Sequence, residues 1–175
     1  MRKKVKKETF NITVYDQKDD NKEKSIIPYP VRCLIVGSSG CGKTTLLLNF
    51  IYKDWVPFKN LYVFSKSLEQ DSYKKLQERY KNVEKEINQQ ISYFYADCED
   101  LIKVDECKQN SLIIFDDCLL ENQDIIKEYF VRGRHKNISS IYLSQCYSMV
   151  DLRVIRNNLN MIIIFKQNDH YTRKI

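Results

Sequence analysis

The sequence predicts an α/β fold with a mainly parallel central sheet, and three observations support this. A short apolar segment that starts at Val31 runs into a glycine-rich turn, which leads into a helix expected over residues 43–52. A second apolar segment, residues 61–64, follows at the separation that a strand–helix–strand crossover requires. Further apolar segments alternate with helical patterns, so we expect at least five strands; these segments are residues 91–95, 111–117, 141–144 and 161–165.

Residues 1–30 are expected to form a basic N-terminal tail and an edge strand, ahead of the main domain at residues 31–175. Residues 1–7 hold five basic side chains, which we interpret as a solvated tail; contact with a nucleic-acid phosphate backbone is the alternative. Residues 10–16 alternate apolar and polar side chains, which is the period of a half-buried strand at a sheet edge. Pro28 and Pro30 should then hold the approach to the next strand extended.

The glycine-rich turn, GSSGCGKTT at residues 37–45, fits the phosphate-binding pattern G-x-x-x-x-G-K-[ST] and holds three of the chain's four glycines. Glycines let successive backbone N–H groups converge on phosphate oxygens, and the N-terminus of the next helix adds partial positive charge. Lys43 should reach the β- and γ-phosphates, and the Thr44 hydroxyl should take a Mg²⁺ position. A loop that merely joins strand to helix is the less favoured alternative. The expected phosphate-binding residues are Gly37, Ser38, Ser39, Gly40, Cys41, Gly42, Lys43, Thr44 and Thr45.

Two helical patterns follow the turn. The first helix directs Leu46, Leu47 and Phe50 inward, and Pro57 prevents its continuation. The second carries an apolar stripe among Lys, Glu and Gln residues, formed by Tyr73, Leu76, Tyr80, Val83 and Ile87. We interpret the stripe as a helix face packed on the sheet; a coiled-coil seam is weaker, because the repeat covers only about two heptads. Residues 97–110 are expected to form a polar helix and loop.

Two carboxylates, Asp116 and Asp117, emerge at the end of the apolar segment SLIIF. Ligands in open α/β sheets bind at the carboxyl ends of strands. Beside a phosphate loop, Asp116 would hold Mg²⁺ through water next to Thr44, and Asp117 would polarise the attacking water. Two acids alone would more often form a solvated turn, so the hydrolase interpretation depends on the upstream phosphate loop.

The last third of the chain adds a polar side chain at another strand end. A helix with four inward residues, Ile125, Ile126, Tyr129 and Phe130, leads to the basic segment VRGRHK and a buried strand at residues 141–144. Gln145 ends that strand, where its amide could orient water or contact the γ-phosphate, or be an ordinary loop residue. Residues 149–157 should form a short helix carrying Arg153 and Arg156, and residues 161–165 a last buried strand.

Composition limits the class of protein. The chain has 175 residues, of which 43% are hydrophobic, and no apolar run approaches the ~20 residues needed to span a bilayer. No signal peptide is recognisable, so we expect a soluble, intracellular protein that is not secreted. Six cysteines without a C-x-x-C pair indicate buried thiols rather than a zinc site or disulfides. The net charge of +6 permits a nucleic-acid partner without requiring one.

Four segments in order, GSSGCGKTT, LIIFDD, GRHKNISSIYLSQ and VIRNNLNMIIIF, resemble the FtsK/HerA superfamily of ring-forming, DNA-pumping ATPases. The sequence looks most similar to the DNA-packaging ATPases of poxviruses, other large DNA viruses and related virus-like transposons. The resemblance covers residues 31–165. It implies a RecA/ASCE-like P-loop NTPase fold in three layers, with the Gln145 strand between the strands that carry Gly37 and Asp116.

The resemblance also implies a function. ATP and Mg²⁺ would be the cofactors of a homo-oligomeric ring that drives double-stranded DNA into a capsid. A capsid portal or vertex protein would be a further partner, at the virus assembly site in the host cytoplasm or nucleus. Arg134 is similar to the family's arginine before the Gln strand, a candidate finger that reaches into the neighbouring subunit's ATP site, with Arg132 as the fallback. The residues expected to act are Lys43, Asp117, Gln145 and Arg134 in catalysis and Thr44 and Asp116 on the metal.

Two departures and two alternatives remain. Many members of the superfamily carry Asp-Glu where this chain has Asp116-Asp117. The side chain of Asp117 is shorter than that of Glu and would end further from the water, although the viral branch tolerates Asp-Asp. The sequence stops soon after its last predicted strand, which leaves open whether a C-terminal portion follows. A small P-loop nucleoside or nucleotide kinase is the alternative function, since GSSGCGKT fits kinases equally well. A non-enzymatic nucleotide-binding module is less favoured because Lys43, Asp116 and Asp117 are all present.

Overall fold

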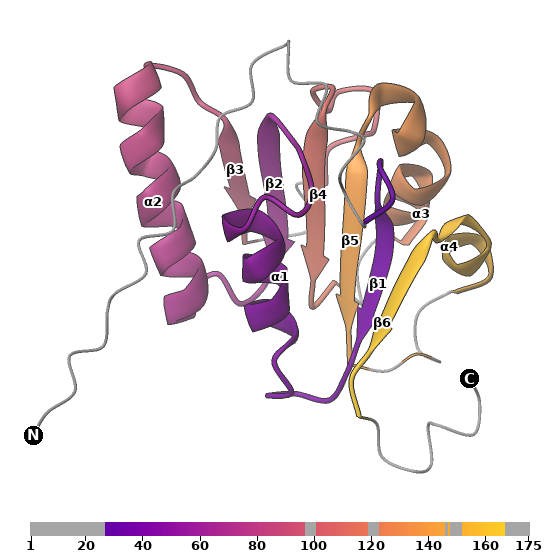
Figure 1. The fold of residues 1–175 in the computed structure, drawn as a ribbon. Coiled ribbons are helices and arrows are strands. Elements are labelled where there is room, and N and C mark those ends of the chain that lie inside the picture. Colours follow the sequence, from indigo (N-terminus) through magenta and orange to yellow (C-terminus); the bar gives the residue numbers. More distant parts are fainter. Residues whose placement is uncertain (1–26, 97–100, 119–122, 146, 148–151, 167–175) are drawn as a thin grey trace, which may run out of the picture.

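The computed structural model describes residues 27–96, 101–118, 123–145, 147 and 152–166. Its elements, in chain order, are β1 (Arg32–Val36), α1 (Lys43–Tyr52), β2 (Asn60–Ser65), α2 (Asp71–Ile87), β3 (Ser92–Tyr95), β4 (Ser111–Asp116), α3 (Gln123–Arg132), the 3₁₀ helix η3 (Gly133–Lys136), β5 (Ser139–Ser144), α4 (Leu152–Asn158) and β6 (Met161–Ile164). All paired strands run parallel, in the order β3-β2-β4-β5-β1-β6 (Figure 1). The predicted α/β fold with a mainly parallel sheet is therefore confirmed.

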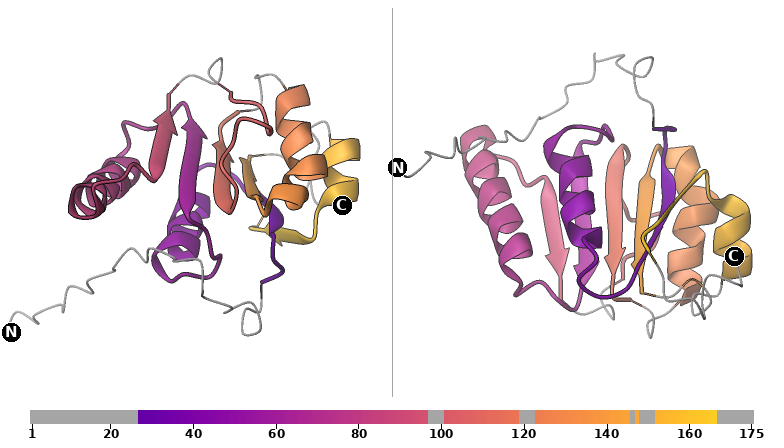
Figure 2. Two further views of the ribbon diagram at one scale, coloured as in Figure 1. Left: turned by 90° about the horizontal axis from the view of Figure 1, so that it is seen from above. Right: turned by 60° about the horizontal axis from the view of Figure 1, so that its bottom comes forward.

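Helices cover both faces of the sheet and produce three layers (Figures 1 and 2). One core contains side chains of α1 and α2, such as Leu47 and Leu76, and the other contains side chains of α3 and α4, such as Tyr129 and Ile155. Successive residues of β1 alternate between these two cores. Strands covered on both faces need continuous apolar runs, which explains why the sequence shows such runs rather than a simple alternation.

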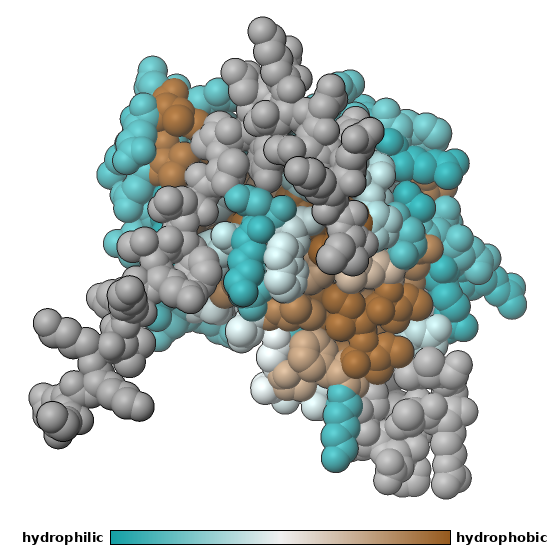
Figure 3. All heavy atoms as spheres, in the orientation of Figure 1, coloured by the Kyte–Doolittle hydropathy of each residue, from teal (hydrophilic) through white to brown (hydrophobic). Residues whose placement is uncertain are grey.

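Helix α2 packs on the sheet through the predicted stripe. Tyr73, Leu76 and Tyr80 are buried, and Val83 is partly buried against the same core. Ile87 is 37% exposed, and apolar side chains at this end of α2 reach the surface (Figure 3). The sheet-facing interpretation is thus confirmed as far as Val83, while the end of the helix extends beyond the sheet.

Two predictions about local structure were wrong. The last strand, β6, is not fully buried: it is an edge strand that pairs only with β1 within the described residues, and Ile162 and Ile164 are 44% and 43% exposed. An apolar run cannot by itself distinguish a central strand from an edge strand. Residues 101–110 contain turns rather than the expected helix. The backbone N–H groups of Glu106 and Cys107 donate to the Lys103 carbonyl, but no further helical hydrogen bonds follow among these residues, and Asn110 takes a positive φ.

Several predicted features lie outside the described residues: the basic tail, the strand at residues 10–16, residues 97–100 and the first residues of the helix expected over 149–157. The remainder of that helix is α4. The domain division at residue 31 stays a prediction. Among the described helices, none combines the length and apolar character that crossing a membrane requires.

The strand register determines what meets at the carboxyl edge of the sheet. Val36 lies beside Ser144, and Leu143 lies beside Asp116. Strand β5 therefore separates β1 from β4, as the family resemblance implied. The glycine-rich turn, Gln145 and Asp117 consequently leave the sheet at neighbouring positions.

Candidate functional site

The glycine-rich turn connects β1 to α1 in a conformation that depends on glycine. Gly40 and Gly42 have φ angles of 73° and 101°, a region that residues with a Cβ rarely adopt. Gly42 is the N-cap residue of α1, without a side-chain cap, and the first turn of the helix holds no acidic residue. The first backbone N–H groups of α1 are therefore available to an anion.

Gly37 is required by packing rather than by its φ angle. A Cβ at this position would lie 2.4 Å from the Cys41 Sγ and 2.8 Å from the Cβ of Phe165. Phe165 is itself fixed beside the turn, because its backbone N–H donates to the Val36 carbonyl at 2.8 Å. Gly37 is thus packed closely between Cys41 of the same turn and Phe165, the residue that follows β6.

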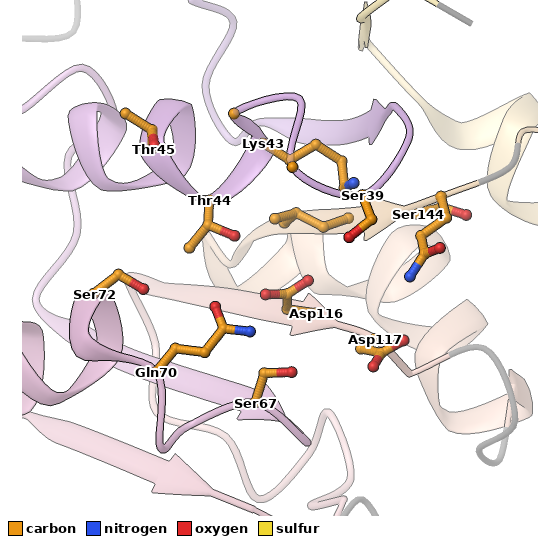
Figure 4. Close-up of a pocket in the computed structure, with 14 residues that line it drawn as sticks. Ser39, Lys43, Thr44, Thr45, Ser67, Gln70, Ser72, Asp116, Asp117 and Ser144 are labelled. Atoms are coloured by element: carbon orange, nitrogen blue, oxygen red, sulfur yellow. The ribbon is translucent and has the colours of Figure 1, made fainter. Parts of the chain in front are cut away.

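Lys43 extends back across the turn that precedes it. Its Nζ donates to the carbonyl oxygens of Gly37 at 2.6 Å and Ser38 at 2.9 Å. Figure 4 shows the ammonium group near Ser39, at the mouth of the turn. A cation held in this position lies where phosphate oxygens would meet the converging backbone N–H groups.

The two acids at the end of β4 have different surroundings. Asp116 is partly buried, and its Oδ2 accepts a hydrogen bond of 2.6 Å from the Tyr73 hydroxyl. Burial raises the pKa of the Asp116 carboxyl. The hydrogen bond from Tyr73 lowers it, the negative charge of Asp117 raises it further, and the positive charge of Lys43 lowers it. Asp117 is exposed, with a φ of 59° that Asp tolerates better than most residues. The two carboxylates are therefore not equivalent.

One cavity of about 560 Å³ joins these groups. This is within the size range of small-molecule sites, roughly 300–1,000 Å³. Thr44 and Asp116 lie on facing sides of it (Figure 4). The residues that line it are Ser39, Gly40, Gly42, Lys43, Thr44, Thr45, Ser67, Gln70, Ser72, Asp116, Asp117, Leu143, Ser144 and Gln145. Hydroxyl and carboxylate oxygens from Thr44, Asp116 and Asp117 are the ligand type that Mg²⁺ prefers, so the donor set fits this ion.

One wall of the cavity was not predicted from the sequence. Ser67, Gln70 and Ser72 come from the end of the β2–α2 connection and the start of α2 (Figure 4). A signal was present, because these polar residues follow a predicted buried strand and so had to emerge at the same carboxyl edge of a parallel sheet.

Arg134 does not line this cavity. It belongs to η3, which precedes β5 and therefore lies at the opposite, amino edge of the sheet (Figure 1). Arg134 is exposed and has no acidic partner within the described residues, and its charge adds to the burial that lowers the pKa of Arg32. Arg132, by contrast, pairs with Asp105 at 3.1 Å and Glu128 at 3.5 Å.

Comparisons with known proteins place this site in context. The family model described as the poxvirus A32 protein matches residues 18–172. No curated protein matches the sequence significantly. The genome packaging NTPase B204 from Sulfolobus turreted icosahedral virus 2, solved with sulfate, is 14% identical over 81% of this chain and 76% of its own, with a TM-score of 0.56. Flagellar accessory protein FlaH from Methanocaldococcus jannaschii is 17% identical over 90% and 83%, with a TM-score of 0.52. At these identities the likeness shows a shared P-loop NTPase fold.

Proposed function

We propose that this chain, which belongs to the poxvirus A32 protein family, is a genome-packaging ATPase. In this proposal it moves double-stranded DNA into a viral capsid. One observation carries the proposal: the phosphate loop, the two acids and Gln145 all border a single cavity. These groups come from three strands whose order was implied by the family resemblance. Binding, water activation and charge stabilisation therefore have candidate residues within one site.

ATP binding would use the turn and Lys43. The open N–H groups at the start of α1 favour phosphate oxygens, and the Lys43 ammonium would exchange its two carbonyl partners for the β- and γ-phosphates. Thr44 and Asp116 would hold Mg²⁺, which when bound neutralises charge on the phosphates. B204, which shares the fold, has been solved with AMPPCP and with ATP-gammaS.

Hydrolysis would divide the two acids between separate tasks. Asp116 is engaged by Tyr73 through one oxygen, which suits a carboxylate held still for a cation. Asp117 is exposed at the cavity and has the freedom to polarise an attacking water. Gln145, at the end of the intervening strand, would orient that water or contact the γ-phosphate.

Arg134 would act in trans, across a subunit boundary of a homo-oligomeric ring. Its place at the amino edge of the sheet favours a target outside its own chain. Its lack of an acidic partner among the described residues leaves the guanidinium available, whereas Arg132 is already engaged. The competing role for the same residue is contact with a DNA phosphate or capping of the C-terminus of the preceding helix.

The proposal is tested by measuring ATP hydrolysis with and without double-stranded DNA. We expect Mg²⁺-dependent hydrolysis that DNA stimulates strongly, because a translocating motor couples turnover to its substrate. Phosphoryl transfer from ATP to a nucleoside or nucleotide, without DNA stimulation, would instead support the kinase alternative. A chain that binds ATP but hydrolyses none under either condition would leave only the binding-module interpretation. The capsid portal or vertex partner and the assembly-site location remain part of the proposal.

A further inference from the structure

Tyr73 connects the core of the molecule to the candidate metal site. It lies in the first turn of α2 and is fully buried, so by sequence it belongs to the stripe that packs on the sheet. Its hydroxyl nevertheless leaves the apolar core and donates to Asp116 Oδ2 at 2.6 Å. A neutral phenol that donates to a carboxylate forms a charge-assisted hydrogen bond, which is stronger than a bond between neutral groups.

Tyr80 shows that packing alone does not explain this contact. It lies on the same helix, is 1% exposed, and its hydroxyl has no hydrogen-bond partner among the described residues. A buried tyrosine of α2 can therefore serve the core without engaging a functional group. The hydrogen bond of Tyr73 to Asp116 is an additional property of that one position.

We infer that Tyr73 is a positioning residue for the metal-binding carboxylate. By occupying Oδ2, its hydroxyl fixes the rotation of the Asp116 carboxylate and leaves Oδ1 as the oxygen available to the cation or to a water bound to it. This inference rests on the proposed ATPase function and assigns a role that no motif in the sequence indicates.

The position of Tyr73 also links the carboxylate to a wall of the cavity. Gln70, which precedes α2, and Ser72, in its first turn, line the cavity within three residues of Tyr73. The Gln70 carbonyl accepts from the backbone N–H of Tyr73 at 3.0 Å. The segment that borders the nucleotide cavity and the residue that orients Asp116 are thus parts of one hydrogen-bonded turn.

The test compares Tyr73→Phe with Tyr80→Phe, which removes the same atom from the same helix. Binding of a fluorescent ATP analogue is titrated over a range of Mg²⁺ concentrations and again in EDTA. We expect Tyr73→Phe to raise about tenfold the Mg²⁺ concentration that gives half of the maximal increase in analogue binding. This is the size typical for losing a hydrogen bond to a charged group. Affinity in EDTA should be unchanged, because Lys43 hydrogen-bonds to the turn and the Tyr73 hydroxyl donates to Asp116 instead. Tyr80→Phe should match the wild type in both conditions.

The alternatives give different results. A wild-type Mg²⁺ requirement in folded Tyr73→Phe would overturn the inference, as would an equal loss of affinity with Mg²⁺ and in EDTA, which indicates a purely structural role. In the Asp116→Ala background, adding Tyr73→Phe should shift the Mg²⁺ requirement no further, since the hydroxyl has already lost the carboxylate that it positions. A larger loss in the double variant also contradicts the inference. If the wild-type protein itself does not bind the analogue, the proposed ATPase function fails instead.

Discussion

The two edges of the sheet differ in how complete their chemistry is. At the carboxyl edge, Lys43 and the acids Asp116 and Asp117 border the same cavity, and both Lys43 and Asp116 have hydrogen-bond partners within the chain. At the amino edge, Arg134 is exposed, lies near another arginine and has no acidic partner within the described residues. The groups of the first edge are organised around one cavity, whereas the guanidinium of Arg134 at the second edge is exposed to solvent. One fold thus presents an organised cavity at one edge and, at the other, an exposed arginine that we propose acts on a second subunit.

The sharpest way to break this comparison is Arg134→Ala. If Arg134 completes a neighbouring ATP site, hydrolysis should fall by about 10³- to 10⁵-fold, the range known for arginine fingers, while ATP binding persists. Arg132→Ala is the matched control: its ion pairs are solvent-exposed and such pairs contribute about 0–1 kcal/mol to stability, so turnover should stay near the wild-type rate. Steady-state ATPase assays and nucleotide titrations separate the two variants.

Mixed oligomers decide whether Arg134 acts in trans. Lys43→Ala subunits, which cannot hydrolyse ATP but keep Arg134, are combined with inactive Arg134→Ala subunits. Some interfaces then pair an intact ATP site with an intact arginine, and part of the activity should return. Verified mixed oligomers without any recovery would refute the finger assignment. A loss limited to DNA-stimulated turnover would point to a phosphate contact.

The second prediction concerns the two acids of the carboxyl edge. Asp117→Asn should keep Mg²⁺-ATP binding and lower hydrolysis by about 10²- to 10⁴-fold, because an amide preserves the shape of the side chain but cannot act as a base. Asp116→Asn should weaken the Mg²⁺ dependence of binding as well. Single-turnover hydrolysis and Mg²⁺ titrations measure the two effects. Equal residual turnover with the same Mg²⁺ requirement in both variants would remove the division of roles.

The third prediction is that Lys43→Ala lowers ATP affinity roughly a hundredfold, since it removes a cation that faces the phosphates. The fold should survive, because the two hydrogen bonds of Lys43 go to carbonyls of a turn that its glycines and Phe165 already hold. Isothermal titration calorimetry on a variant with an unchanged melting temperature provides the check. Unaltered affinity would show that the turn is not the phosphate site.

The sequence predicted that the glycine-rich turn and the two acids would meet at one edge of the sheet, and the reason is physical. A phosphate loop needs particular residues in a contiguous segment, and acids at the end of an apolar strand must emerge at the same edge as the loop when the sheet is parallel. Tyr73 was predicted only as a core residue, because helical spacing reveals which face is buried and says nothing about a hydroxyl that meets Asp116 from another element. The partly exposed β6 escaped prediction for a similar reason, since edge or centre depends on strand order.

The smallest expected effect is that of a substitution at Cys41. It tests how far ATP hydrolysis at the carboxyl edge depends on packing within the glycine-rich turn. The Cys41 Sγ occupies the space where a Gly37 side chain would be, which favours the interpretation of the thiol as a small filler. Cys41→Ala should therefore change ATP hydrolysis by less than about threefold, in line with the modest cost of removing one partly exposed atom. Gly37→Ala is the contrasting variant: its methyl group would meet both Cys41 and Phe165, and the turn would have to move.

Oxidation distinguishes the filler role from a reactive one. If Cys41 is only a filler, the Cys41→Ala enzyme should lose activity in peroxide at the same rate as the wild type. Clear protection by Cys41→Ala would instead make this thiol a reactive group next to the phosphates. ATP hydrolysis at the carboxyl edge would then depend on an oxidant from outside the chain, just as Arg134 at the amino edge is proposed to depend on a second subunit. The two edges would no longer differ in this respect.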